Sequence, residues 1–132
     1  MTKFIVNKSN ARDKIREILD EHCGNFAFGN PELIEYIRSE DMLNAIMDVI
    51  DDGLERGVTK VTFECVIDNF KVDIDVVVHN VRGGLNSKLT NNTDCVGVVN
   101  LRVYVQDLHT ETRYDICDYV TCEIVMSTDI RK

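Results

Sequence analysis

The first part of the chain places its apolar residues with helical spacing. One set falls at i, i+4, i+7 and i+8, which predicts a helix over roughly residues 10–23. Its members are Ala11, Ile15, Ile18 and Leu19. Ser9 or Asn10 suits the N-cap of this helix, and Gly24 suits the left-handed position after its end.

Two further helical segments follow. An Asn-Pro pair that ends in Pro31 is typical of a helix start, so we expect a second helix from Pro31 to about Arg38. Ser39 suits a new N-cap with acidic residues in the turn after it, where the helix restarts or bends. From there one apolar stripe continues to an end near Gly53 or Gly57. The stripe consists of Met42, Leu43, Ile46, Met47, Ile50 and Leu54.

From about residue 58 onward, apolar and polar residues alternate with a period of two, which is typical of strands with one buried face. Two alternating runs flank Asp68 and Asn69, and this predicts a hairpin with a two-residue turn. Buried positions must pair with buried positions, because a slip by one residue would turn every apolar side chain to water. This register sets Cys65 opposite Val72 and Phe63 opposite Ile74.

Two later runs complete the predicted sheet, over about residues 96–106 and 113–126. Their inward positions are Val99, Leu101, Val103 and Val105 in the first and Tyr114, Ile116, Val120, Cys122, Ile124 and Met126 in the second. The whole pattern predicts an α+β fold. Two or three N-terminal helices pack on one face of a four-stranded antiparallel sheet, a meander, and the other face is largely exposed to water.

Asp118 breaks the alternation of the last run. A regular strand would direct this carboxylate into the core between Ile116 and Val120, where an unpaired charge is costly. We therefore expect a bulge near Asp118 that turns the side chain outward. If Asp118 were buried instead, it would be a candidate acid with a raised pKa.

Length and composition agree with a single domain over residues 1–132. With 44% apolar residues and one proline, the chain has enough side chains for one core. No segment approaches the roughly 18 consecutive apolar residues of a membrane span, and the start, with only Phe4, Ile5 and Val6, is too short for a signal peptide. The five cysteines lack framework spacing and are typical of reduced thiols. We therefore expect a soluble cytoplasmic protein without a membrane partner.

The net charge of −8 is concentrated in residues 32–75. That segment carries twelve acidic and four basic residues, whereas the segments before and after it are nearly balanced. Five of its acids lie on the polar side of the third predicted helix: Asp41, Asp48, Asp51, Asp52 and Glu55. Such a patch selects for cations or basic partners. Together with extra carboxylates from the sheet, this helix ridge would imitate a row of nucleic-acid phosphates in charge density. The alternative is a solvated helix face that keeps the protein soluble.

The predicted hairpin sets Glu64 directly opposite Asp73 on the exposed sheet face, with Asp75 on the diagonal. Like charges across a strand pair are unfavourable, so we expect compensation. The candidates are Lys60, Lys71 or Arg102 of the same face, a bound cation or a basic partner. A solvated face whose repulsion is screened by salt is the alternative.

The segment of residues 82–94 between the second and third strands is longer than the usual hairpin connection. Gly83 and Gly84 expose backbone N–H groups near Arg82 and Lys88, which is one way to hold a phosphate-like anion. Neither a Walker motif nor a dinucleotide fingerprint is present. A loop without a ligand is the alternative.

Metal and thiol chemistry find little support in the sequence. Cys117 and Cys122 are five residues apart, so a regular strand directs them to opposite faces. The three histidines show no ligand-type spacing. Cys65 and Cys122 occupy inward positions, where thiols are poor nucleophiles. We expect no metal, no cofactor and no catalytic residue, and a small enzyme that uses Asp118, His79 or a cysteine is the weakest of three functional hypotheses.

The favoured hypothesis is a non-enzymatic interaction protein. It uses the helix acids together with Glu64, Asp73 and Asp75 to engage a basic protein surface, for example to inhibit a protein that handles nucleic acid. This requires the acids to gather on one exterior region. The second hypothesis is a small-ligand protein that closes residues 82–94 over a nucleotide-like anion.

Two expectations concern partners. Direct binding of nucleic acid is disfavoured, because the sequence has no basic stripe with interleaved aromatic residues. The unpaired edges of the predicted sheet, together with apolar residues on its exposed face such as Val66, Val77 and Tyr104, favour a homodimer.

Overall fold

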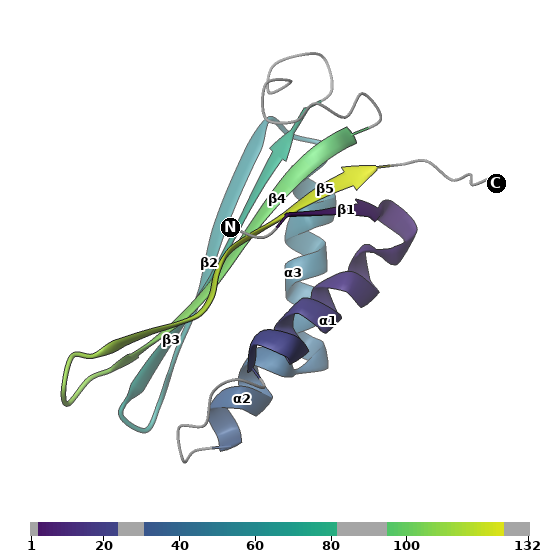
Figure 1. Cartoon of the computed structure of the whole chain (residues 1–132). Coiled ribbons are helices and arrows are strands. Elements are labelled where there is room, and N and C mark those ends of the chain that lie inside the picture. The colour runs from purple at the N-terminus through teal and green to yellow at the C-terminus, as the bar shows by residue number, and fades with distance from the viewer. Residues whose placement is uncertain (1–2, 24–30, 82–94, 126–132) are drawn as a thin grey trace.

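A computed structural model of the chain describes residues 3–23, 31–81 and 95–125. The elements in chain order are strand β1 (Lys3–Asn7), a 3-10 helix (Lys8–Asn10), helices α1 (Ala11–Cys23), α2 (Pro31–Arg38) and α3 (Glu40–Gly53), and strands β2 (Val58–Ile67), β3 (Phe70–Asn80), β4 (Cys95–Asp107) and β5 (Arg113–Val125). The helices lie together on one side of the sheet (Figure 1). The expected α+β class is thereby confirmed.

The sheet has five strands in the described residues, in the order β1-β5-β4-β3-β2. Strands β2 to β5 are antiparallel neighbours in chain order, as a meander requires. The expectation of four strands, all antiparallel, is wrong because β1 pairs with β5 in parallel orientation. The three apolar residues near the N-terminus are too few to show a strand period. The segment becomes a strand because β5 offers unpaired backbone groups at its edge, and Val6 is then buried at 5% exposure.

Local capping explains where the helices begin. Ser39 Oγ accepts a hydrogen bond from the backbone N–H of Met42 at 3.1 Å, so Ser39 is the N-cap of α3 as expected. In front of α1, the capping side chain is Asn7, which is the N-cap of the 3-10 helix that contains Ser9 and Asn10. Asn7 Oδ1 accepts a hydrogen bond from Ser9 N at 3.1 Å and begins the 3-10 turn that leads into α1. In the described ranges, no helix has the length and apolar character needed to cross a membrane.

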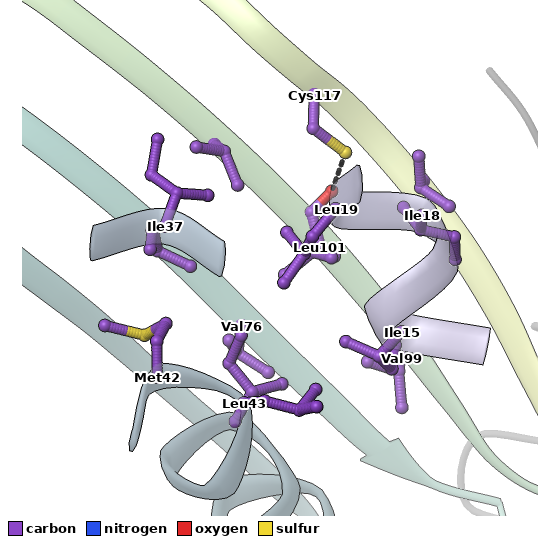
Figure 2. Close-up of a cluster of buried hydrophobic side chains, with 14 of the residues drawn as sticks. Ile15, Ile18, Leu19, Ile37, Met42, Leu43, Val76, Val99, Leu101 and Cys117 are labelled. Carbon is purple, nitrogen blue, oxygen red and sulfur yellow. Dashed lines mark hydrogen bonds between the residues drawn. The ribbon is translucent and has the colours of Figure 1, made fainter. Parts of the chain in front are cut away.

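The core lies between the helices and one face of the sheet. Figure 2 shows side chains of α1, α2 and α3 directed toward those of β3 and β4. Ile15 and Ile37 from the helices, and Val76 and Leu101 from the sheet, are exposed by 1% or less. Burial of each aliphatic side chain of this size stabilises the folded state by about 1.5–3 kcal/mol relative to exposure. The opposite face of the sheet carries the alternate residues of every strand and has no described helix over it (Figure 1).

The β2–β3 hairpin has the register expected from its alternation. Cys65 pairs with Val72 and Phe63 with Ile74. Asp68 in the turn has a φ of 54°, a left-handed conformation that aspartate tolerates. Helix cover decreases toward the sheet edge, because the inward residues of β2 are half-buried whereas those of β3 are mostly fully buried.

A bulge in β5 explains the unusual position of Asp118. Leu101 pairs with Val120, and Val103 pairs with Cys117. Two positions along β4 therefore correspond to three along β5, and β5 has one extra residue there. Asp118 is exposed, and the expected bulge is confirmed. The same bulge corrects the expectation for two thiols. Cys117 and Cys122 are both buried, at 0% and 1% exposure, because the strict alternation between them is broken.

Gly53, at the end of α3, provides a test of the packing between helix and sheet. A Cβ atom on Gly53 would lie 2.5 Å from Val78 Cβ on β3. Gly53→Ala is therefore expected to lower the free energy of unfolding by about 1–3 kcal/mol, the usual cost of overpacking a core. Gly57→Ala is the control, since nothing lies within 4 Å of a Cβ at that position. Urea denaturation measures both variants, and an unchanged midpoint for Gly53→Ala would contradict the close contact.

Candidate functional site

The structure divides the eight predicted partner-binding carboxylates between opposite sides of the molecule. Helix α3 packs on the sheet face that carries the core, so its acids are exposed on the helix side. Glu64, Asp73 and Asp75 occupy the alternate positions of β2 and β3, on the face without a described helix (Figure 1). The expectation of one continuous acidic region is wrong, because the core and the sheet lie between the two sets.

The first set forms what we call the α3 ridge: Asp41, Asp48, Asp51, Asp52 and Glu55. All five residues are exposed. The apolar stripe of α3 faces the sheet, and the helical period therefore turns the four aspartates to solvent, whereas Glu55 lies in the turn just after the helix. The helix is about 18 Å long from Asp41 to Gly53 at 1.5 Å per residue, so the ridge is an extended negative surface rather than a compact cluster.

Basic side chains neutralise part of the α3 ridge. Lys8 Nζ lies 2.8 Å from Asp51 Oδ1, and Arg56 Nε lies 2.9 Å from Asp52 Oδ1. Both acids are about half exposed, and ion pairs of this kind contribute little to stability. Within the described residues, Asp41, Asp48 and Glu55 form no ion pair. The ridge therefore keeps a net negative charge that faces solvent.

The second set, which we call the outer-face cluster, consists of Glu64, Asp73 and Asp75. Glu64 is directly opposite Asp73, as predicted from the hairpin register. Compensation comes from this chain: Lys71 Nζ lies 3.5 Å from Glu64 Oε2. Thr62 Oγ1 donates a hydrogen bond to Asp75 Oδ1 at 2.8 Å.

Asp73 is the least exposed member of the outer-face cluster, with 4% of its surface accessible. Burial raises the pKa of its carboxyl group above the usual 3.8, Lys71 opposes this effect, and the neighbouring Glu64 reinforces it. Tyr104 on β4 is directly opposite Asp73, and burial together with the Asp73 and Asp75 carboxylates raises the pKa of its hydroxyl group. Asp73 thus lies beside two further carboxylates, Glu64 and Asp75, with Lys71 as the opposing cation, and an ionised carboxylate there is less favourable than in water.

Two arginines enclose the Tyr104 ring. Arg113 and Arg102 lie 3.9 and 4.8 Å from its centroid, within the range of cation–π attraction. Both guanidinium groups also lie 3.4 Å from Asp115 Oδ1. The Asp115 carboxylate therefore has two cationic partners within the chain.

Glu123 on β5 is a buried carboxylate that the sequence did not indicate. It is 2% exposed, and its Oε2 lies 2.5 Å from Lys3 Nζ on β1. Pairing of β1 with β5 places Ile5 beside Glu123 on the outer face. Strict alternation correctly predicts that Glu123 faces outward. Its burial depends on β1, the strand that the sequence pattern did not predict.

The cysteine side chains are positioned for packing. Burial raises the pKa of Cys23 to about 11, of Cys117 to about 12 and of Cys122 to about 11. Cys117 Sγ lies 3.9 Å from the carbonyl oxygen of Leu101 (Figure 2). The described residues contain no group of three or more His, Cys, Asp or Glu that would hold a metal ion.

The residues predicted for an anion site, Arg82, Gly83, Gly84 and Lys88, lie outside the described residues. Strand β3, which precedes them, ends at Asn80, and strand β4, which follows them, begins at Cys95. A ligand site in this segment therefore stays a prediction.

Comparisons with known proteins give no assignment. No protein-family model matches the chain, and neither the curated proteins nor the solved structures contain a match.

Asp73→Asn is expected to stabilise the protein at neutral pH. Because the folded-state pKa of Asp73 is raised, its ionisation costs stability above about pH 3.8, and the cost disappears at lower pH, where the group is protonated in both states. The expected gain is about 0.2–1 kcal/mol, the size of a cross-strand charge effect. Thermal unfolding at neutral pH and at acidic pH measures it. A variant that is less stable than the unchanged protein at neutral pH would contradict the interpretation, and Asp75→Asn on the same strand is the control.

Cys65 is expected to react first when the folded protein is treated with iodoacetamide at neutral pH. It is half-buried, whereas the other four cysteines are buried. High pKa values keep Cys23, Cys117 and Cys122 protonated, and the thiolate is the reactive form. Peptide mass spectrometry over time identifies the modified residue, and Cys65→Ser removes the fast phase. Modification of Cys117 as fast as Cys65 would show that the core is more open than described.

Proposed function

We propose that this protein is a non-enzymatic interaction protein whose α3 ridge binds a basic surface of another protein. The observation that carries the proposal is the environment of Asp41, Asp48 and Glu55. They are exposed and, in the described part of the chain, have no basic partner. Their charges are available to cations of a second molecule.

The spread of the ridge favours a protein partner over a metal ion. A calcium ion needs six to eight oxygen ligands around one point, whereas these carboxylates follow the length of a helix. Lys and Arg side chains of a partner reach the carboxylates one at a time. Charge complementarity of this kind accelerates association and selects the partner.

We propose a nucleic-acid-handling protein as the partner. Helical turns repeat every 5.4 Å, and phosphates of one DNA strand follow each other every 3.4 Å along the axis. Lys8 and Arg56 pair with the adjacent acids Asp51 and Asp52. The charge that imitates a phosphate row therefore comes from Asp41, Asp48 and Glu55, which face solvent. A basic surface adapted to nucleic acid would accept the ridge in its place, and the protein would inhibit by competition.

The outer-face cluster has no part in this proposal. Two of its acids have partners within the chain, namely Lys71 for Glu64 and Thr62 for Asp75, and the third, Asp73, is only 4% exposed. A basic partner would have to displace these contacts. A partner that binds Asp41, Asp48 and Glu55 of the ridge would not have to displace an ion pair within the described residues.

We further propose that the protein acts in a reducing compartment such as the cytoplasm. All five cysteines are free, and four of them are buried. An oxidising compartment favours disulfides, and the core of this chain is built with thiols instead. Two alternatives stay open as hypotheses: a nucleotide-like anion held by residues 82–94, and a small enzyme.

The test neutralises the unpaired acids in the combined variant Asp41→Asn, Asp48→Asn and Glu55→Gln. The immobilised protein is expected to capture a basic protein from an extract of its native host at low salt and to release it at high salt. The triple variant is expected to bind this protein about tenfold more weakly, since three exposed charge pairs contribute about 0.5 kcal/mol each. Surface plasmon resonance with the captured protein measures the loss.

The matched control removes three exposed acids elsewhere, Asp13→Asn, Glu111→Gln and Asp118→Asn, and so changes the net charge equally. It should bind nearly as well as the unchanged protein. Equal losses in both triple variants would mean that only net charge matters, and unchanged binding of the ridge variant would remove the basis of the proposal. Competition between the protein and nucleic acid for the captured partner tests the inhibitory role separately.

A further inference from the structure

Strand β2 forms one edge of the sheet and hydrogen-bonds only to β3 among the described residues. It is ten residues long, twice the length of β1 at the opposite edge. It contains no proline, and its ladder to β3 has no register shift. A long, regular edge strand is a template for another strand.

The hairpin ladder shows which residues of β2 have outward backbone groups. Asn80 N donates to Gly57 O at 2.9 Å, so residue 57 bonds to β3. Along an antiparallel strand, only every second residue forms backbone hydrogen bonds to a given neighbouring strand. Residues 59, 61, 63, 65 and 67 therefore also form hydrogen bonds to β3. The even-numbered residues from 58 to 66 direct their N–H and C=O groups away from the sheet.

The side chains of these even-numbered residues lie on the outer face and form a self-complementary series. In chain order they are Val58, Lys60, Thr62, Glu64 and Val66. When two copies of β2 run antiparallel with Thr62 opposite Thr62, each Lys60 lies opposite a Glu64 and each Val58 opposite a Val66. All five outward positions pair, with opposite charges together and apolar residues together.

Other registers lose this match. A shift by one residue would turn the outer face of one copy toward the helix side of the other. A shift by two residues in one direction sets Lys60 opposite Val66, and in the other direction it sets Val58 opposite Glu64. The register centred on Thr62 is also the one in which the two strands overlap over the full length from residue 58 to residue 66.

The environment of Lys60 and Glu64 in one chain supports the same register. Lys60 faces Val77 across the hairpin and, within the described residues, has no acidic partner. Glu64 faces Asp73, a like charge whose pKa is already raised. The second copy would bring its Lys60 beside Glu64, and the row across the joined sheets would then read Asp73, Glu64, Lys60, Val77. Within one chain, Lys71 is the single cation beside these two carboxylates, 3.5 Å from Glu64, and the second copy's Lys60 would add another.

Exposed apolar surface points in the same direction. Val58 and Val66 are 56% and 59% exposed, and they are two of the four large apolar residues that are exposed in the described chain. On the helix side of the strand, the same register sets Val61 opposite the second copy's Phe63. Both residues are half-buried in one chain because α3 covers β2 incompletely. Pairing would remove apolar area from water on both faces.

We propose that two copies of this protein form a symmetric dimer through antiparallel pairing of their β2 strands, with Thr62 on the twofold axis. The sheets join into one continuous sheet across the two chains. The interface is independent of the α3 ridge, because the ridge lies on exposed helix residues and the pairing uses the backbone edge and the outer face of β2.

Charge exchange at one pair provides the test. Size-exclusion chromatography with light scattering is expected to give twice the 15.1 kDa of one chain. Lys60→Glu and Glu64→Lys, each alone, set like charges opposite each other twice per dimer and should weaken dimerisation about tenfold or more. The double variant Lys60→Glu, Glu64→Lys restores opposite charges in the same register and should dimerise nearly as well as the unchanged protein. Analytical ultracentrifugation over a concentration series gives the dissociation constants.

A second variant tests the backbone. Thr62→Pro removes an N–H group that faces away from β3, which proline tolerates on an edge strand, and it should give a folded monomer. Circular dichroism confirms the fold, and Asp118→Lys is the matched control for a reversed charge on another exposed strand position. A monomeric unchanged protein would overturn the proposal. So would a dimer that persists in Thr62→Pro, or a double variant no better than the single ones.

Discussion

Burial of one face of the sheet under the helices is the constraint on which the rest of this structure depends. Val72, Ile74, Val76 and Val78 of β3 are fully buried beneath the helix layer, and the matching positions of β4 are buried with them. Because side chains alternate along a strand, the burial of these residues determines which residues of the meander face outward. It also requires close approach of helix and sheet, which the absence of a side chain at Gly53 permits.

The same constraint determines how charge is distributed. Acids on α3 and acids on β2 and β3 are near each other in the sequence, yet the core separates them. On the outer face, neighbouring strands supply compensation: Lys71 contacts Glu64 and Thr62 contacts Asp75. On the helix side, the exposed surface of α3 has no further layer over it in the described structure, so several of its acids face only solvent. Negative charge alone is therefore a weaker guide to a binding surface than the partners available around it.

The two sheet edges differ in character. At one edge, a short parallel strand covers β5, and the pair between Lys3 and the buried Glu123 stabilises it. At the other edge, β2 is long and regular, and it carries valines and opposite charges in a symmetric order. Burial of Glu123 without its lysine would be costly, so β1 is held in place by charge as well as by backbone hydrogen bonds. The edge at β2 has no comparable cover in the described chain.

Local patterns in the sequence determined the three helices, the Ser39 cap, the hairpin register and the outward turn of Asp118, because periodicity, capping and alternation involve residues close together in the chain. Only the tertiary structure decided the parallel pairing of β1, the burial of Glu123 beside Lys3, the inward position of both Cys117 and Cys122, and the separation of the two acidic sets. Most of these features depend on contacts between residues that are far apart in sequence. The thiols depend on where a bulge places its extra residue, which is settled by the fit of β5 to β4 and the core rather than by composition.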